Sequence, residues 1–238
     1  MINSFQIVPT HLQIVHLKIT FTALFHSPKA SMRNSISSYC KIKDSQINLN
    51  GEILFSAAPA NFEGFSKAAY NHLQLNYLKF FKMDNLCKLA LLCSEALLKN
   101  KALKKRYAPE DIALIISNSA SSLDTDRKHS LSIKDRANYF PSPSVFVYTL
   151  PNILVGEICI RNNFKGENSF FIFDKFDADF MATQVKQLLD TSLAKVCITG
   201  WVDYDKEQAD AFLCLIEKSE DLNQLELTKE NFNNLYFK

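Results

Sequence analysis

Apolar residues recur at helical spacing in three stretches of the chain. Behind Asp84, a residue suited to cap a helix N-terminus, apolar positions at i, i+3, i+4 and i+7 predict a helix over 84–99. A similar stripe follows Asp177 and predicts a second helix that ends near residue 190. Pro151 fits the first turn of a third helix, which we expect to reach residue 162.

Short apolar runs bounded by turn residues predict buried β-strands, and one alternating stretch near the N-terminus predicts another. These strands cover residues 17–25, 112–117, 169–173, 194–200 and 211–216. Because strands and helices alternate along the chain, we predict an α/β fold with a layered mixed sheet and helices.

The remaining stretches show little periodicity. We expect residues 1–16 to form an N-terminal appendage to a domain that spans 17–238. Residues 27–78 are expected to be loop with short helices, and 118–139 to be loop. The last 20 residues are expected to form a frayed or packed tail.

Composition narrows the class of protein. The 238 residues are 47% hydrophobic and 22% charged, which is ordinary for a chain with a buried core. The formal charge of +2 gives no bias toward nucleic acid or an anionic membrane, and neither partner is expected. The lysine-rich run at 99–106 is interpreted as a solvated face at the negative end of the preceding helix. No apolar run is long enough to cross a membrane, so we expect no membrane span and a cytoplasmic protein.

The six cysteines indicate buried thiols. None form a CxxC motif, none have zinc-ligand spacing with a histidine, and their neighbours are apolar. We interpret them as reduced thiols packed as small hydrophobic residues, which suits the cytoplasm. With only 5 glycines and no phosphate-binding or metal-binding motif, we expect no cofactor.

Five stretches, in order and with roughly the right spacing, resemble the N-terminal half of the β-ketoacyl synthases (3-oxoacyl-acyl-carrier-protein synthases). They are 80–84 with the helix behind it, the strand 112–117, 146–152 with Gly156 after it, 165–166 with the strand 169–173, and 196–200 with the strand that ends at Glu217. The most specific is 149–152, which is similar to the family's Asn-Thr-Leu-Pro-Asn segment. The resemblance implies a thiolase-like fold, of which this chain holds the N-terminal half only.

The resembling family keeps a nucleophilic cysteine in a turn between a strand and a helix, where the helix N-terminus stabilises the thiolate that accepts an acyl chain. Counting forward from Gly166 and back from Gly200 places Lys175 at this position. The resemblance therefore implies that no catalytic residue is intact. Neighbouring acids are expected to hold Lys175 as an ion-paired ammonium, with a Schiff-base role or a plug in the acyl pocket as alternatives; the acids are Asp174, Asp177 and Asp179.

The resemblance predicts a non-catalytic ketosynthase-like subunit, similar to a chain length factor, in fatty acid, polyketide or aryl-polyene-type pigment synthesis. The family's two histidines belong to its C-terminal half, and none of the five histidines here corresponds to them. The implied partners are an active β-ketoacyl synthase subunit, in a heterodimer, and an acyl carrier protein. Candidate interface or acyl-cavity residues are Phe146, Tyr148, Thr149, Leu150, Pro151, Asn152, Phe170 and Ile172.

Two other functions remain open. One is an acyltransferase of the 3-oxoacyl-acyl-carrier-protein synthase type with its nucleophile elsewhere, for which Cys159 and Cys197 are the nearest thiols. The other is an inactive scaffold. In each case a lone half of this fold would leave an apolar face exposed, which we expect the N-terminal segment, a second copy or a partner to cover.

Overall fold

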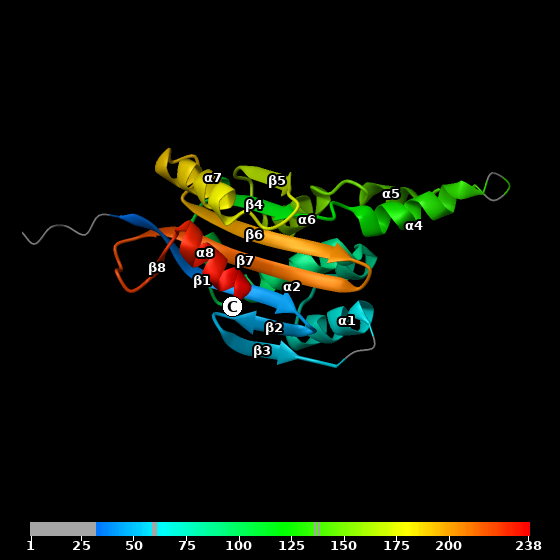
Figure 1. The fold of residues 1–238 in the computed structure, drawn as a ribbon, viewed down its shortest axis with the longest axis horizontal. Helices are drawn as coiled ribbons and strands as arrows, with labels where there is room; N and C mark the ends of the chain where they lie inside the picture. Colours follow the sequence, from blue (N-terminus) through cyan, green and yellow to red (C-terminus); the bar gives the residue numbers. More distant parts are fainter. Residues whose placement is uncertain (1–31, 59–60, 136, 138) are drawn as a thin grey trace, which may run out of the picture. The chain divides into compact units, whose positions relative to one another are not determined.

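A mixed β-sheet with helices on both faces organises the residues that the computed structural model describes, which are 32–58, 61–135, 137 and 139–238 (Figure 1). The sheet runs in the order β3-β2-β1-β7-β6-β4-β5, and β8 pairs with β1. The strands are β1 (Arg33–Lys43), β2 (Gln46–Leu49), β3 (Glu52–Ser56), β4 (Ile112–Asn118), β5 (Asn168–Ile172), β6 (Val196–Asp205), β7 (Gln208–Ser219) and β8 (Leu225–Glu226).

The sheet confirms four predicted strands, of which β4, β5 and β6 form its parallel part. β4 lies between β5 and β6 and is parallel to both, and every residue of β4 is buried because helices cover both of its faces. β7 is antiparallel to β6 and to β1. β6 and β7 extend beyond the predicted runs because they form a long hairpin, which turns at Lys206 and Glu207 with φ of 48° and 67°.

The three predicted helices are also confirmed, and two of them begin at the predicted aspartate caps. α2 (Asn85–Leu98) begins behind Asp84, which accepts a hydrogen bond from the Cys87 amide at 2.9 Å, and α7 (Ala178–Asp190) begins behind Asp177. The third predicted helix is α6 (Ile153–Asn162), whose N-cap is Asn152, so Pro151 precedes the helix and does not lie in its first turn. The other helices are α1 (Phe62–His72), η1 (Leu78–Lys82), α3 (Leu103–Arg106), η2 (Pro109–Asp111), α4 (Leu123–Lys134), α5 (Pro143–Val147) and α8 (Lys229–Phe237).

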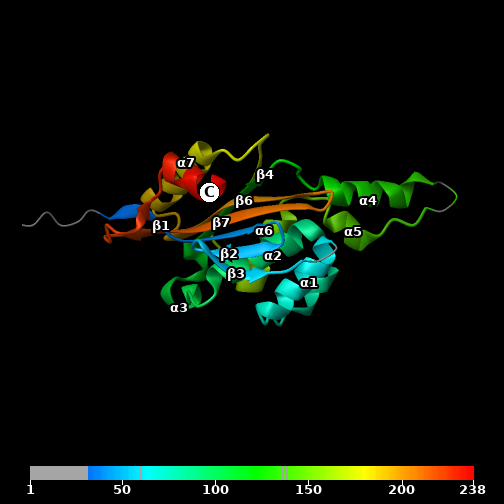
Figure 2. The ribbon, with the colours of Figure 1, turned by 60° about the horizontal axis from the view of Figure 1, so that its bottom comes forward.

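The helices form two layers. α1, α2 and α6 lie on one face of the sheet, and α7 and α8 lie on the other (Figure 2). α2 is apolar on nearly all sides, because it is enclosed by the sheet, α1 and α6. Among the described residues, no helix is long and apolar enough to cross a bilayer.

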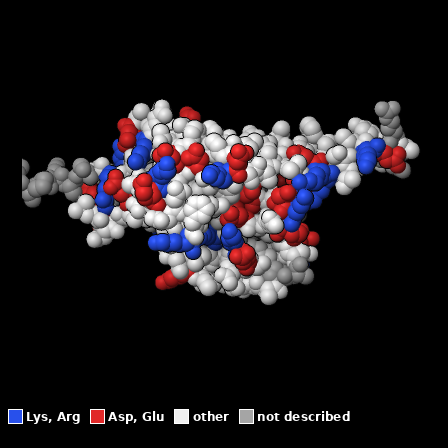
Figure 3. Space-filling view, viewed as in Figure 1, with Lys and Arg blue, Asp and Glu red and all other residues white. Residues whose placement is uncertain are grey.

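The C-terminal tail is packed rather than frayed. Phe232 of α8 is fully buried, and its ring centroid lies 5.2 Å from that of Phe176 and 5.5 Å from that of Phe212. α8 therefore covers apolar surface on the α7 side, which we had expected the N-terminal segment, a second copy or a partner to cover. Lys, Arg, Asp and Glu side chains are spread over this face (Figure 3).

The expectation of loop over 27–78 is wrong for most of its described part, where β1, β2, β3 and α1 form. β1 was hard to recognise because its buried positions include small polar residues such as Ser35 and Ser38. Both hairpin turns have recognisable chemistry, since Asp44–Ser45 and Asn50–Gly51 adopt positive φ and Asn-Gly is typical of tight hairpins.

The expectation of loop over 118–139 is wrong as well. α4 covers 123–134, and the sequence obscures it because only one of its residues, Thr125, is buried. Such a helix has no apolar stripe to reveal its period. The predicted strand 17–25 and the appendage 1–16 lie outside the described residues.

Candidate functional site

The turn from β5 into α7 is built around a buried aromatic ring. Phe176 packs among aromatic residues from three other elements, with its ring centroid 6.1 Å from Trp201 and 4.8 Å from Tyr236. Directly after it, the Asp177 carboxylate accepts a hydrogen bond from the Phe180 amide at 3.0 Å and so fixes the start of α7. The turn is therefore anchored on both sides of the helix start.

Lys175 precedes Phe176 in this turn, and its side chain is exposed. The expected ion pair is not formed, because among the described residues no carboxylate lies within 4.0 Å of its amine. Asp179 instead lies 3.6 Å from Lys229 of α8. Asp179 is therefore closer to Lys229 of α8 than to an ion pair with Lys175, and the side chain of Lys175 is exposed to solvent.

A hollow of about 510 Å³ opens beside Lys175 between the turn and α8. Its lining mixes charged residues with apolar ones: Phe173, Asp174, Lys175, Phe176, Asp177, Ala178, Asp179, Lys229, Asn233 and Phe237. A pocket for an acyl chain needs a continuous apolar lining. This hollow is open and partly charged, so it does not have the character of an acyl tunnel.

The two thiols that the sequence offered as alternative nucleophiles are poorly suited to that role. Cys197 is fully buried in β6, and burial raises its thiol pKa. Cys159 lies on α6, where burial raises its pKa to about 11. A thiol with a raised pKa holds little thiolate near neutral pH, and the thiolate is the reactive form.

Helices α4 and α5 form an arm that begins beyond the end of β4 (Figure 1). Thr125 of α4 donates a hydrogen bond to the half-buried Asp84 carboxylate at 2.7 Å, and partial burial raises the pKa of Asp84. The hydroxyl of Ser122 donates to the carbonyl oxygen of Thr149 at 2.6 Å, which joins the two helices. Arg127 also pairs with Asp205 of β6. The base of the arm is thus held to the body by several polar contacts.

Apolar side chains are exposed along this arm and at the end of β5. Of the candidates taken from the sequence, Phe146, Leu150 and Ile172 are about half exposed, at 55%, 50% and 53%. β5 is the last strand of the sheet in the described part of the chain, so one of its edges is unpaired. An unpaired edge beside exposed apolar residues is typical of a surface that another protein chain covers.

The remaining candidates lie closer to the core. Tyr148 is buried, and its hydroxyl donates to Glu157 at 3.0 Å; burial and the nearby carboxylate raise its pKa. Lys79 lies 2.7 Å from the same carboxylate. Thr149 and Pro151 are half-buried, Asn152 is exposed before α6, and Phe170 packs against the core. These side chains therefore contribute more to holding the arm in place than to the exposed surface that a partner could contact.

Sequence reasoning missed most of the apolar surface on the arm because it assigned 118–139 to loop. Leu123 and Leu131 of α4, and Phe140 before α5, are 43%, 70% and 79% exposed. The signal that could have found them is the presence of isolated large apolar residues in an otherwise polar helix. Such residues cannot form a core stripe, so they favour a contact surface.

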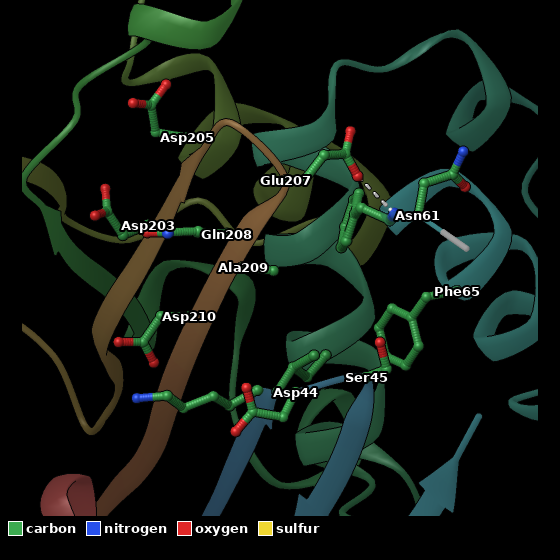
Figure 4. A pocket seen from close by; sticks show the side chains of 13 residues that line it. Asp44, Ser45, Asn61, Phe65, Asp203, Asp205, Glu207, Gln208, Ala209 and Asp210 are labelled. Atoms are coloured by element: carbon green, nitrogen blue, oxygen red, sulfur yellow. Dashed lines mark hydrogen bonds between the residues drawn. The ribbon is translucent and has the colours of Figure 1, made fainter. Parts of the chain in front are cut away.

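A second hollow, of about 590 Å³, lies at the β6–β7 turn and holds five carboxylates (Figure 4). Glu207 accepts hydrogen bonds from the Phe62 amide at 2.7 Å and the Tyr204 hydroxyl at 3.1 Å, and Asp210 accepts one from Tyr236 at 2.7 Å. These carboxylates tie α1 and α8 to the hairpin. Among the described residues no group of His, Cys, Asp or Glu is arranged to hold a metal ion.

Comparison with known proteins finds similarity in structure alone. No protein family model matches this sequence, and no curated protein matches it. The structure is similar to "The ishigamide ketosynthase/chain length factor", with a TM-score of 0.59 and 14% identity over 81% of this chain. It is also similar to a chain from the complex of the ketosynthase ApeO with its chain length factor ApeC from Xenorhabdus doucetiae, with a TM-score of 0.51 and 13% identity over 79% of this chain.

A third similar structure is the AntDE:AntF complex, described as a type II polyketide synthase acyl carrier protein with its ketosynthase, with a TM-score of 0.54 and 10% identity over 80% of this chain. The match spans 64% and 63% of the ishigamide and AntDE:AntF chains, which is less than two thirds of their length. It spans 80% of the Xenorhabdus chain, so that chain and this one are similar in length. The described chain therefore has the thiolase-like fold of the ketosynthases.

Proposed function

We propose that this chain, which has a ketosynthase fold, is a non-catalytic subunit that pairs with an active β-ketoacyl synthase in fatty acid, polyketide or aryl-polyene-type synthesis. The observation that carries the proposal is Lys175, exposed in the turn between β5 and α7. In the resembling family this turn holds the cysteine that takes the acyl chain. A lysine that attacked a thioester would form an amide, which does not pass the acyl chain on.

The surface for the partner is the unpaired edge of β5 together with the exposed apolar residues of the α4–α5 arm. Phe146, Leu150 and Ile172 provide apolar contact area there, and the polar base of the arm fixes its direction. Similarity to chains from ketosynthase and chain length factor complexes supports this assignment. The acyl carrier protein would then deliver its acyl group to the partner's cysteine.

A reconstitution tests the proposal. The chain is mixed with an active β-ketoacyl synthase and with an acyl carrier protein. Size-exclusion chromatography with light scattering measures the assembly, and mass spectrometry measures product length. We expect a heterodimer and a product length that differs from that of the synthase alone.

The Lys175→Ala variant separates pairing from chemistry. It should form the same heterodimer and change product yield by less than about twofold, because the proposal gives the lysine no chemical step. Loss of product with an intact heterodimer would show that Lys175 takes part in catalysis. If the wild-type chain forms no heterodimer with the synthase, the proposed pairing is refuted.

A further inference from the structure

A third hollow, of about 390 Å³, lies where the end of α8 meets the hairpin of β1 and β2. It shares no lining residue with the hollow beside Lys175. Its lining is Tyr39, Lys41, Lys43, Asp44, Gln46, Asn48, Gly51, Leu235 and Lys238. In Figure 3, lysine or arginine side chains lie where Figure 1 draws the end of α8 beside β1 and β2.

Strand β1 presents a row of polar side chains to this hollow. Tyr39, Lys41 and Lys43 lie on the same side of the sheet, because alternate residues of a strand point to the same face. The residues between them, Cys40 and Ile42, are buried in the core on the opposite face. The row therefore stands beside the end of α8 and outside the core.

The two lysines of this row have no carboxylate within 4.0 Å among the described residues. The amine of Lys41 donates to the carbonyl oxygen of Tyr236 at 3.0 Å, at the end of α8, where the helix supplies roughly half a negative charge. Burial lowers the pKa of Lys41; Asp210 opposes this shift, and the nearby Lys43 adds to it. The two ammonium groups repel each other, and an anion between them would relieve the repulsion.

The neutral groups of the hollow add hydrogen-bond donors. The hydroxyl of Tyr39 has no hydrogen-bond partner in the described part of the chain, and it occupies room that Gly51 leaves, 3.1 Å from where a Cβ would lie. The side-chain oxygen of Asn48 accepts from the Gly51 amide at 2.9 Å, so its NH2 group is left to donate. Asp44 is the one carboxylate side chain of the lining. Free donors beside two positive charges suit an anion with several acceptor oxygens.

We propose that this hollow binds a small phosphorylated molecule, with its phosphate group between Lys41 and Lys43. A phosphate monoester has three acceptor oxygens and a charge of about −1.5 to −2 near neutral pH, which matches two lysines and two neutral donors. The volume of about 390 Å³ falls within the ~300–1,000 Å³ of small-molecule sites and leaves room for an organic group beside Leu235. The site is separate from Lys175 and from the pairing surface, so it is tested independently of them.

An extended polyanion fits this place less well. Lys43 and Asp44 also line the hollow at the β6–β7 turn, which holds five carboxylates. A nucleic acid or an anionic membrane that covered the lysines would also approach these carboxylates, and like charges repel. A small ligand can contact the lysines alone.

The test titrates the full chain, labelled with nitrogen-15, with phenyl phosphate at constant ionic strength, and follows the amide signals by NMR. We expect signals of the β1–β2 hairpin to shift, with an affinity at least about tenfold higher than for benzoate, which has one negative charge and two acceptor oxygens. Lys41→Gln with Lys43→Gln should weaken binding by at least about tenfold. Lys67→Gln with Lys186→Gln removes the same charge from α1 and α7 and should weaken it by less than about twofold.

Single variants keep the test valid if loss of Lys41 disturbs the end of α8. Lys43 is exposed and makes no ion pair in the described part of the chain, so Lys43→Gln should keep the fold and weaken binding by at least about threefold. Tyr39→Phe should weaken it by about threefold, because one donor is lost. No shift in the hairpin, equal affinity for benzoate, or full affinity in Lys43→Gln would overturn the proposal. Tighter binding of single-stranded DNA or of phosphatidylglycerol vesicles than of phenyl phosphate would overturn it as well.

Discussion

Gly200 lies where β6 crosses closest to β7. Its φ is +151°, and a Cβ atom there would lie 2.0 Å from the carbonyl oxygen of Phe212, a backbone atom that is fixed by sheet pairing. We expect Gly200→Ala to lower the free energy of unfolding by more than about 3 kcal/mol, measured by urea denaturation. In Gly156→Ala the added Cβ meets nothing within 4 Å, and it should raise the stability by about 0.5–1 kcal/mol because glycine weakens a helix. Equal effects at both positions would contradict this account.

The ion pair between Arg127 and Asp205 holds the arm to β6 and gives stability a pH dependence. The hydrogen bond that Arg127 donates to the Asp205 carboxylate lowers the pKa of Asp205 below its ordinary value of 3.8. A carboxyl with a lowered pKa contributes stability above its unfolded pKa and loses it as the pH falls through the folded value. We expect Asp205→Asn to be less stable than the wild type at pH 6, and the difference to vanish in acid below 3.8. Chemical denaturation at several pH values measures it; a difference that persists in acid would rule out the ion pair as its source.

The position of Lys175 in the turn could be predicted by counting residues, but its surroundings could not. The sequence has Asp174, Asp177 and Asp179 beside Lys175, but in the structure Asp179 lies 3.6 Å from Lys229 of α8. Contacts between residues far apart in the chain therefore decide which cation each aspartate pairs with. The sequence pattern carries no signal for such contacts.

At the scale of elements, α8 closes the α7 side of the sheet. Phe232 is fully buried against Phe176 and Phe212, so Phe232→Ala should leave a cavity and lower the free energy of unfolding by about 3–5 kcal/mol. Phe237 on the same helix is 73% exposed, and Phe237→Ala should change stability by less than about 0.5 kcal/mol. Thermal and urea unfolding of the two variants make the comparison. Similar small losses for both would mean that α8 is not part of the core.

Elements with a full apolar period were predictable, and elements without one were not. α2 and α7 have both an apolar stripe and an aspartate cap, and β4 is apolar throughout. β1 alternates serine and lysine with apolar residues, and α4 buries a single residue, so neither has the pattern of an element that makes the core. β1 is an interior strand and α4 lies in the arm, so the two elements were missed for their sequence pattern and not for a shared place in the fold.

At the scale of the whole molecule, the two faces of the sheet are covered within the described chain, and the end strand β5 is not. α8 covers apolar surface on the α7 side, whereas Ile172 at the end of β5 and Phe146 on the arm remain exposed. Apolar surface that the fold leaves uncovered favours association through the β5 edge.

The pairing surface can be tested without loss of the fold. Phe146→Asp with Ile172→Asp places two charges where a partner chain would bury apolar area, and burying an unpaired charge is costly, so the affinity for the synthase should fall by at least about a hundredfold. Because both side chains are exposed, the melting temperature of the free chain should stay within about 2 °C of the wild type. Leu222→Asp is the control, since Leu222 is 72% exposed in the loop before β8, and it should leave the affinity unchanged. Isothermal titration calorimetry with the purified synthase gives the affinities, and equal affinities for the double variant and the control would place the interface elsewhere.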